Sequence, residues 1–378
     1  MEIKNLKKAA VRILKAIKNK EKILLYGDAD LDGVSSVIIL KEAIKNLGGE
    51  ISAIYFPDRE TEGYGISEKG LKKLKKFSPA LFIALDCGIG NFKEIKLAKK
   101  LGFEIIVIDH HEILDNLPEA NIIVDPKQES DKYPFKELAT VGIAFKLSEI
   151  LLKEKMTPAL RSNFLELVAI GTIADMMPQV EENKIFVAEG LNSLKNSFRP
   201  GLLAFFEADF LKGYDLSQKV SKIISILNVR DVENNLPASF RLLTSPSIEK
   251  AKKIISKLRE KSKFRKEKIQ KIIKEIEIRI SGKEEPIVFE GSQDWEFSII
   301  SPVASFFCRR LKKPVFIFKK LKNESQGTVR TPSGIDSVEI MKKCKKYLIT
   351  YGGHPRASGF RIRNENLEEF KKCLIKNL

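Results

Sequence analysis

Residues 22–33 read KILLYGDADLDG, an apolar run that ends in three aspartates at alternate positions, Asp28, Asp30 and Asp32. Three carboxylates this close repel one another, so they persist only when a cation neutralises them or when water solvates them. The same pattern begins a calcium EF-hand loop, in which the twelfth position is a bidentate Glu. Counted from Asp28, that position is Ile39, and the residues before the motif are typical of a buried strand. An EF-hand is therefore not expected.

Four further apolar runs follow along the chain, at 51–57, 80–88, 104–111 and 121–126. Short apolar strands that alternate with amphipathic helical segments predict βαβ units and a parallel sheet buried on both faces. In such a sheet the ligand site lies beyond the carboxyl ends of the strands. Acidic or imidazole side chains follow several of the predicted strands, and we expect them to converge: Asp28, Asp30, Asp86, Asp109, His110, His111 and Asp125.

The chain of 378 residues is long enough for two or three domains. We expect an α/β fold with a parallel-sheet catalytic domain at 1–210, a helical linker at 211–285 and a smaller C-terminal α/β domain at 286–378. Residues 249–283 contain 14 basic and 5 acidic residues over regularly spaced apolar positions, which predicts a long amphipathic helix. Such a helix is equally typical of a solvated connector and of a nucleic-acid-binding face.

The composition bounds the class of protein. A formal net charge of +17 favours a polyanionic partner, nucleic acid first, although a generally lysine-rich composition explains it equally well. No apolar run approaches the length of a membrane span, and the N-terminus lacks the apolar centre of a secretory signal. The four cysteines are far apart and form no CxxC pair. That spacing argues against a zinc ribbon or a disulfide framework and predicts a cytoplasmic protein.

The chain has 3 histidines, and all of them lie in two local motifs, which favours a functional role. His110 and His111 follow Asp109, and His354 lies in YGGHPRASGF. The candidate metal ligands are mostly carboxylates: Asp28, Asp30, Asp32, Asp86, His110 and Asp175. Such donors suit Mn²⁺ or Mg²⁺ better than a thiolate-bound zinc. Because one ion does not need so many carboxylates, we expect two ions, about 3.5–4 Å apart, that clamp a phosphate.

Four motifs occur in the order GDADLDG, LDCG, DHH and GTIADMMP, and YGGHPRASGF follows them. Together they resemble the signature of the DHH phosphoesterase superfamily and of its DHH-associated C-terminal domain. Within that superfamily, SILNVRDVENNLPASFRLLTS and GTVRTPSGID are similar to segments of the RecJ-like single-strand nucleases, including their compact archaeal members. The resemblance covers nearly the whole chain. It implies a DHH catalytic domain at 1–210 and a DHH-associated, substrate-binding domain at 286–378.

The resemblance also implies the roles of individual residues. It assigns metal binding to Asp30, Asp32, Asp86, His110 and Asp175. In it Asp86 bridges the two ions, Asp109 orients a histidine, and His111 lies near the scissile phosphate. The catalytic set is therefore Asp86, Asp109 and His111. The substrate contacts are Arg230, Arg330, Ser333, Gly352, Gly353 and His354.

Two tyrosines stand out against this pattern. Many relatives have His four residues before the acid matched by Asp30, where this chain has Tyr26. Either Asp28 compensates for that His, or the first metal is held more weakly. Tyr64, in EGYGIS, is either a base-stacking residue or an anchor of its loop.

These observations predict a metal-dependent phosphodiesterase, a RecJ-like exonuclease that hydrolyses single-stranded DNA or RNA by a two-metal mechanism. An alternative hypothesis is an enzyme for short substrates, such as small oligoribonucleotides, 3′-phosphoadenosine phosphate or cyclic dinucleotides. A non-catalytic replication scaffold is a third hypothesis, disfavoured because all five matched ligands are present. Replication or repair proteins are candidate partners, and no membrane partner is expected.

Overall fold

The computed structural model describes residues 2–59, 61–113, 116–282 and 284–378. The chain forms two compact units, Met1–Glu260 and Lys261–Leu378, and their boundary falls inside the long helix α11 (Ile248–Ile280). Residues 211–285, predicted as a separate linker, are therefore divided between the two units. None of the described helices is both long enough and apolar enough to cross a membrane.

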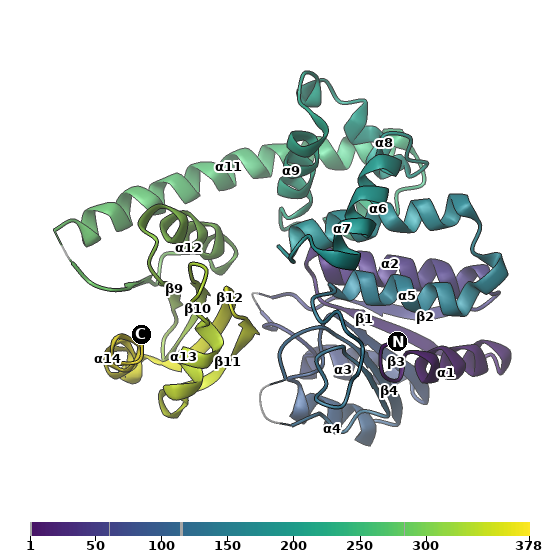
Figure 1. The fold of residues 1–378 in the computed structure, drawn as a ribbon, viewed down its shortest axis with the longest axis horizontal. Helices are drawn as coiled ribbons and strands as arrows, with labels where there is room; N and C mark the ends of the chain where they lie inside the picture. The colour runs from purple at the N-terminus through teal and green to yellow at the C-terminus, as the bar shows by residue number, and fades with distance from the viewer. Residues whose placement is uncertain (1, 60, 114–115, 283) are drawn as a thin grey trace. The chain divides into compact units, whose positions relative to one another are not determined.

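Within its described residues, the first unit contains a five-stranded parallel sheet of order β2-β1-β3-β4-β5 (Figure 1). The strands are β1 (Ile23–Gly27), β2 (Ile51–Tyr55), β3 (Ala80–Leu85), β4 (Phe103–Ile108) and β5 (Ile122–Val124). Each lies within or next to an apolar run identified in the sequence, and every pairing between them is parallel. The predicted α/β fold with a parallel sheet is confirmed.

Alternate residues of each strand face opposite sides of this sheet, as strands buried on both faces require. Ile23 and Leu25 of β1 belong to the core under one set of helices, and Leu24 and Tyr26 belong to the core on the other side. Figure 1 shows α2 and α5 side by side on one face, with α3 and α4 on the other. The first face is covered by α1 (Leu6–Lys18), α2 (Leu31–Asn46) and α5 (Thr140–Leu152). The second face is covered by α3 (Glu68–Leu74) and α4 (Phe92–Lys100).

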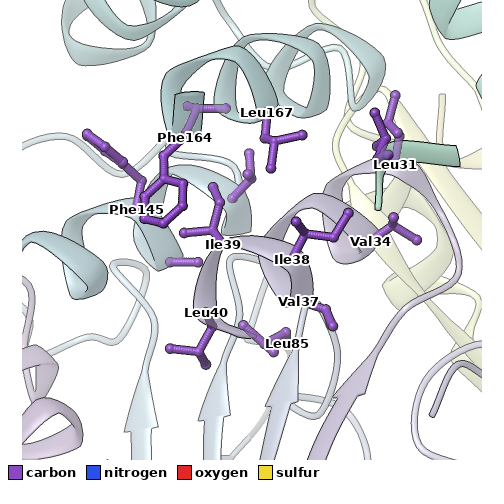
Figure 2. Close-up of a cluster of buried hydrophobic side chains, with 14 of the residues drawn as sticks. Leu31, Val34, Val37, Ile38, Ile39, Leu40, Leu85, Phe145, Phe164 and Leu167 are labelled. Carbon is purple, nitrogen blue, oxygen red and sulfur yellow. The ribbon is translucent and has the colours of Figure 1, made fainter. Parts of the chain in front are cut away.

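Helix α2 lies between the sheet and the helices α5 and α6 (Pro158–Ala174), and 12 of its 16 residues, all described, are buried. Figure 2 shows Ile39 pointing toward Phe145 and Phe164 of the covering helices, with Leu85 of the sheet among the same buried side chains. Full burial of one such aliphatic side chain contributes about 1.5–3 kcal/mol. This packing fixes the start of α2, where the aspartates lie.

The first turn of α2 depends on two residues of the aspartate motif. Asp30 is the N-cap residue, and its Oδ1 accepts a hydrogen bond from Gly33 N at 3.0 Å. Gly33 lies directly against the backbone of Asp28, where an added Cβ would be 2.5 Å from the carbonyl oxygen. A side chain at position 33 would therefore push the aspartate motif away from α2.

Further helices complete the first unit, and most of their apolar side chains belong to the same core as α2. They are α7 (Glu181–Leu194), α8 (Pro200–Phe206), α9 (Leu216–Leu227) and α10 (Ala238–Leu243). A short ribbon of β6 (Val232–Glu233) and β7 (Leu236–Pro237) precedes α10. Residues 211–260 thus pack with the rest of the first unit.

The described part of the second unit contains a mixed five-stranded sheet of order β11-β12-β10-β9-β8, with β8 and β9 parallel and the other pairs antiparallel. Its strands are β8 (Val288–Ser292), β9 (Val315–Lys320), β10 (Glu324–Arg330), β11 (Leu348–His354) and β12 (Ala357–Arg363). One face packs on α12 (Phe297–Leu311) and the end of α11, and the other packs on α13 (Ser337–Lys343) and α14 (Leu367–Lys376). The smaller C-terminal α/β fold is confirmed.

A disulfide joins Cys344, at the end of α13, to Cys373 of α14. The wide cysteine spacing, which argued against a disulfide framework, did not predict this single bond. Their sequence separation of 29 residues carries no pairing signal, and only the packing of two helices on one face of the sheet brings their Cα atoms to 6.0 Å. Cys87 and Cys308 are free and buried.

The contact between Gly33 and Asp28 generates a stability prediction. We expect Gly33→Ala to lower the free energy of unfolding by about 1–3 kcal/mol, because backbone must move to admit the methyl group. Gly90→Ala is the matched control, since a Cβ at Gly90 meets no atom within 4 Å among the described residues. Urea unfolding followed by circular dichroism measures both variants. Equal stability of the two variants would contradict the close approach.

Candidate metal centre

Four strands of the first unit end at the same level and are followed by acidic residues. Gly27, Leu85, Ile108 and Val124 are in register across β1, β3, β4 and β5. The residues after them therefore begin side by side: Asp28, Asp86, Asp109 and Asp125. All four are buried. Parallel register thus gathers carboxylates from distant parts of the sequence at one edge of the sheet, as the strand pattern predicted.

His110 lies within this cluster and is fully buried. Its Nε2 is 3.4 Å from Asp86 Oδ1, 3.4 Å from Asp175 Oδ2 and 3.6 Å from Asp32 Oδ2. Asp175 is the C-cap residue of α6, and Asp32 lies in the first turn of α2. The ends of two helices and two strands therefore meet at one imidazole ring.

The donor atoms of the predicted ligands form compact groups, each with its atoms within 4.8 Å of one another. Asp32, His110 and Asp175 form one such group. A second group is formed by Asp28, Asp30 and Asp86, and a third by Asp86, Asp109 and His111. Asp86 belongs to the second and third groups, and its Oδ1 is also 3.4 Å from His110 Nε2 of the first, so it adjoins both predicted ion positions.

Asp32 is oriented by the start of α5. Its Oδ2 accepts a hydrogen bond from Thr140 N at 2.9 Å, and its Oδ1 accepts one from Val141 N at 2.8 Å. A helix N-terminus stabilises a carboxylate in this position. Thr140 Oγ1 also donates to Asp86 Oδ1 at 3.0 Å, so one threonine orients two carboxylates. Thr140 was not among the predicted site residues, because a threonine at a helix start does not reveal which group it faces.

The carboxylates of the cluster are poorly neutralised. Burial, followed by repulsion from neighbouring carboxylates, raises the pKa of Asp32 and that of Asp86 well above their usual value. Burial and the charge of Asp30 raise the pKa of Asp175 to about 7. Asp175 Oδ2 is also buried and accepts no hydrogen bond from the described residues. A divalent cation would supply the positive charge that these groups lack.

His110 has the properties of a metal ligand. Burial, and then the charges of His111 and Lys127, lower the pKa of His110 well below its usual value, so the ring is neutral and has a lone pair to donate. Carboxylate oxygens with one imidazole are a donor set that fits Mn²⁺ or Mg²⁺. The residues present at this edge therefore fit the two ions that the sequence implied.

Arg59, in the segment between β2 and α3, was missed by the sequence analysis and contacts two of the aspartates. Its Nε donates to Asp28 Oδ1 at 3.1 Å, and its Nη2 donates to Asp28 Oδ2 and, at 2.9 Å, to Asp30 Oδ2. Burial alone would raise the pKa of Asp30, but Arg59 and the Gly33 N–H hold it below its usual value. One guanidinium engages both oxygens of Asp28, which distinguishes Asp28 from Asp30 as a candidate ligand.

His111 is held on two sides. Its Nδ1 is 2.7 Å from Asp109 Oδ1, and its Nε2 is 3.0 Å from Tyr64 Oη. Burial would lower the pKa of His111, but Asp109 outweighs that effect and raises it to about 9. The Asp109 carboxylate is itself oriented by Ile89 N at 3.0 Å and His110 N at 2.8 Å. His111 is thus a cation with a fixed ring, and 18% of its side chain is exposed to solvent.

The second unit brings two of its predicted substrate contacts to one end of its sheet. Arg330 and His354 both pair with Ala357, from opposite sides of β12. Residues opposite one another in an antiparallel sheet share a face, so these side chains lie about 10 Å apart across one alanine. Arg330 donates to Thr328 Oγ1 at 3.0 Å and to the hydroxyl of Ser301.

The remaining predicted contacts are divided between the two units. Ser333 is exposed in the segment after β10, and Gly352 and Gly353 precede His354 in β11. Gly353 has φ of +126°, which a residue with a side chain rarely adopts. Arg230 belongs to the first unit and forms an ion pair with Asp58.

Two family models match the chain. The DHH family, N-terminal domain, matches residues 22–172, and the DHHA1 domain matches residues 284–378. The first match contains nearly every predicted metal ligand, and Asp175 lies three residues beyond its end. The second match contains Arg330, Ser333 and the YGGHPRASGF segment.

The chain is similar to curated and solved RecJ proteins. It is 34% identical to the single-stranded-DNA-specific exonuclease RecJ of Bacillus subtilis, over 99% of this chain and 48% of that protein. It is 27% identical to the RecJ of Salmonella typhimurium, over 96% of this chain and 67% of that protein. The chain thus spans about half the length of the Bacillus relative.

Two crystal structures share its fold. A structure of exonuclease RecJ bound to manganese is 26% identical, with a TM-score of 0.79 over 100% of this chain and 94% of that one. RecJ of Thermus thermophilus in complex with Mn²⁺ is 24% identical, with a TM-score of 0.83 over 100% of this chain and 55% of that one. Because both domains occur in the same order and the likeness runs over nearly the whole sequence, the chain belongs to the DHH superfamily, as a RecJ-like member.

Proposed function

We propose that this chain is a Mn²⁺- or Mg²⁺-dependent phosphodiesterase that acts as an exonuclease on single-stranded nucleic acid, with DNA as its main substrate. The observation that carries the proposal is the convergence of buried, poorly neutralised carboxylates around the neutral His110 imidazole. The relatives named as single-stranded-DNA-specific exonucleases support the substrate class. The manganese-bound RecJ structure supports the choice of metal.

The donor groups suggest how two ions would be held. We assign Asp32, His110 and Asp175 to one ion and Asp30 to the other, with Asp86 shared between them. Asp28 is a weaker candidate for the second ion, because Arg59 engages both of its oxygens. When bound, such ions lower the pKa of a water molecule and offset the charge that develops on a phosphate.

We assign the remaining side chains of the cluster to positioning the substrate phosphate and stabilising its charge. His111 is a cation with part of its ring exposed, so its positive charge would offset negative charge on the scissile phosphate. Asp109 keeps that ring charged and fixed in orientation. In the second unit we assign phosphate binding to Arg330, His354, Ser333 and the backbone at Gly352 and Gly353, and in the first unit to Arg230.

The cellular setting is part of the same proposal. A single-strand nuclease of this class would act in the cytoplasm, with replication or repair proteins as partners. The alternative enzyme for short substrates is not favoured, because the curated relatives that cover nearly the whole chain are named for single-stranded DNA. Digestion of a long labelled strand, compared with a dinucleotide under the same Mn²⁺ concentration, separates the two activities.

The ligand assignment predicts the effect of removing a shared donor. We expect Asp86→Asn and His110→Ala each to reduce kcat on 5′- or 3′-labelled single-stranded DNA by at least about 10³-fold, because each removes a metal ligand. Asp131→Asn is the control, since Asp131 is also buried in the first unit but bonds Lys4 N and Tyr133 N outside the cluster. Substantial Mn²⁺-dependent cleavage by a protein with both substitutions would contradict the assignment.

The raised carboxylate pKa values predict how stability depends on pH without metal. For Asp32, Asp86 and Asp175 the folded-state pKa lies above the usual one, so their stabilising contribution is complete below the unfolded-state pKa, near 4. It is lost as the pH rises through the folded-state values, which for Asp175 is about 7. We therefore expect the Tm of EDTA-treated protein to fall between about pH 5 and pH 8, and Mn²⁺ to reverse the fall.

Differential scanning fluorimetry with and without 1 mM Mn²⁺ measures this dependence. Asp86→Asn should flatten the decline in the metal-free protein, because it removes one of the repelling carboxylates. A Tm that rises with pH in the absence of metal would show that the cluster is not under repulsion.

The assignment of Arg330 to phosphate binding predicts a change in substrate affinity. We expect Arg330→Ala to raise KM for single-stranded DNA about tenfold, with a smaller change in kcat. The slope of log KM against log salt should also decrease, by the amount that corresponds to the loss of about one phosphate contact. Arg363→Ala, at an exposed arginine at the far end of β12, should change neither quantity. An unchanged salt slope in Arg330→Ala would remove this residue from the phosphate contacts.

A further inference from the structure

We infer that Tyr26 is a positioning residue, whose phenol hydroxyl fixes the loop of residues 61–67 and thereby holds Tyr64 against His111. The inference rests on the proposed function, since it gives Tyr26 a part in the hydrolytic reaction. It also gives a role to Tyr26, the position at which many relatives have His.

The hydroxyl of Tyr26 is bonded to the backbone of the loop. The side chain is fully buried at the end of β1. Its Oη accepts a hydrogen bond from Ser67 N at 3.0 Å and donates one to the Gly65 carbonyl at 3.2 Å. A phenol hydroxyl has one proton to donate, and Tyr26 uses it on this loop. Tyr26 therefore acts on the loop backbone.

A second tyrosine secures the same loop. The ring of Tyr26 stacks on that of Tyr55 with centroids 5.3 Å apart. Tyr55 Oη donates to the Glu62 carboxylate at 2.9 Å, and Ser67 Oγ donates to the same carboxylate. The Glu62 side chain is only 3% exposed. The two tyrosines thus hydrogen-bond the loop at Glu62, Gly65 and Ser67, from the α3–α4 face of the sheet.

Tyr64 lies between these anchor points but faces the metal centre. Its Oη donates to the Asp86 carbonyl at 3.1 Å, and its ring centroid is 5.5 Å from that of His111. It is also 52% exposed, so packing alone does not hold it in place. Asp86 has φ of +62°, an unfavourable conformation for a residue with a side chain. The hydroxyl of Tyr64 thus reaches two residues of the predicted catalytic set.

The anchored backbone explains why the exposed Tyr64 side chain keeps one orientation. Gly65 has φ of +83°, and Ile66 N donates to Asn91 Oδ1 at 3.0 Å, so the chain bends at residues 64–66. The bonds from Tyr26 close this turn on the next residues. Without them, the turn would remain tied by Asn91 and Glu62 but would be free to shift relative to His111.

Conservative substitutions test the inference. Tyr26→Phe keeps the stacked ring and removes the hydrogen bonds to Gly65 and Ser67. Tyr64→Phe removes the hydroxyl that contacts Asp86 and His111. We expect each to lower kcat about tenfold, with KM for single-stranded DNA and the half-saturating Mn²⁺ concentration within about twofold of wild type. The kcat of the double variant should not fall below that of the less active single variant, because Tyr26 acts through Tyr64.

Hydrogen–deuterium exchange supplies a readout that does not depend on activity. Tyr26→Phe should speed exchange at Ser67, whose N–H loses its acceptor, by about tenfold or more. Tyr133→Phe is the matched control, because Tyr133 is also buried in the first unit and donates its hydroxyl proton to Glu182. That variant should alter neither exchange in residues 61–67 nor kcat.

The outcomes separate this inference from the proposed function. No Mn²⁺-dependent hydrolysis by the wild-type protein would overturn the proposed function and, with it, the part of Tyr26 in the reaction, while exchange at Ser67 would still decide whether Tyr26 fixes the loop. Full kcat in Tyr26→Phe, or losses that multiply in the double variant, would overturn the inference while hydrolysis stands. A higher Mn²⁺ requirement in Tyr26→Phe would also overturn it, because it would place the hydroxyl at the metals.

Discussion

The first unit gathers uncompensated negative charge at the carboxyl edge of its parallel sheet, and the contacts around that edge depend on this charge. Strand register and the start of α2 bring carboxylates together, and Arg59 and His111 are the cations that contact them directly among the described residues. Backbone N–H groups at the start of α5 stabilise Asp32, and Thr140 donates to Asp86. These contacts orient the carboxylates without removing the repulsion that raises their pKa values. Divalent ions would complete this balance, so metal binding and stability are coupled.

Burial of apolar side chains offsets the repulsion between these carboxylates. Helix α2 is buried on several sides, between the sheet and the helices α5 and α6, and each buried aliphatic side chain contributes about 1.5–3 kcal/mol. That stabilisation offsets the repulsion at the N-terminus of the same helix. Gly33 matters for the same reason, because it lets the first turn of α2 lie against the backbone of Asp28. The packing of α2 therefore holds the candidate ligands in place, as a preorganised metal site would require.

The sequence predicted what depends on short-range pattern and missed what depends on packing between distant segments. Apolar runs marked all strands of the parallel sheet, and the residues that end them include the donors that gather around His110. Arg59 lies in a segment with no periodicity, and the Cys344–Cys373 bond joins two helices that only the sheet brings together. Residues 211–260, part of the predicted linker, bury their apolar side chains in the core of the first unit, and a local helical pattern does not reveal which core a helix joins.

The two faces of the parallel sheet serve the metal centre differently. On one face, α2 and α5 orient the acidic ligands through their N-terminal turns. On the other, Tyr26 and Tyr55 hold the segment between β2 and α3, which carries both Arg59 and Tyr64. Arg59 contacts the carboxylates of the first motif, and Tyr64 contacts the Asp86 backbone and His111. A shift of residues 61–67 would move Tyr64 and change the orientation of His111, whereas Arg59, which lies outside that loop, would keep its contacts with Asp28 and Asp30. A buried hydroxyl outside the ligand set therefore affects the reaction through His111 and not through the metal ligands.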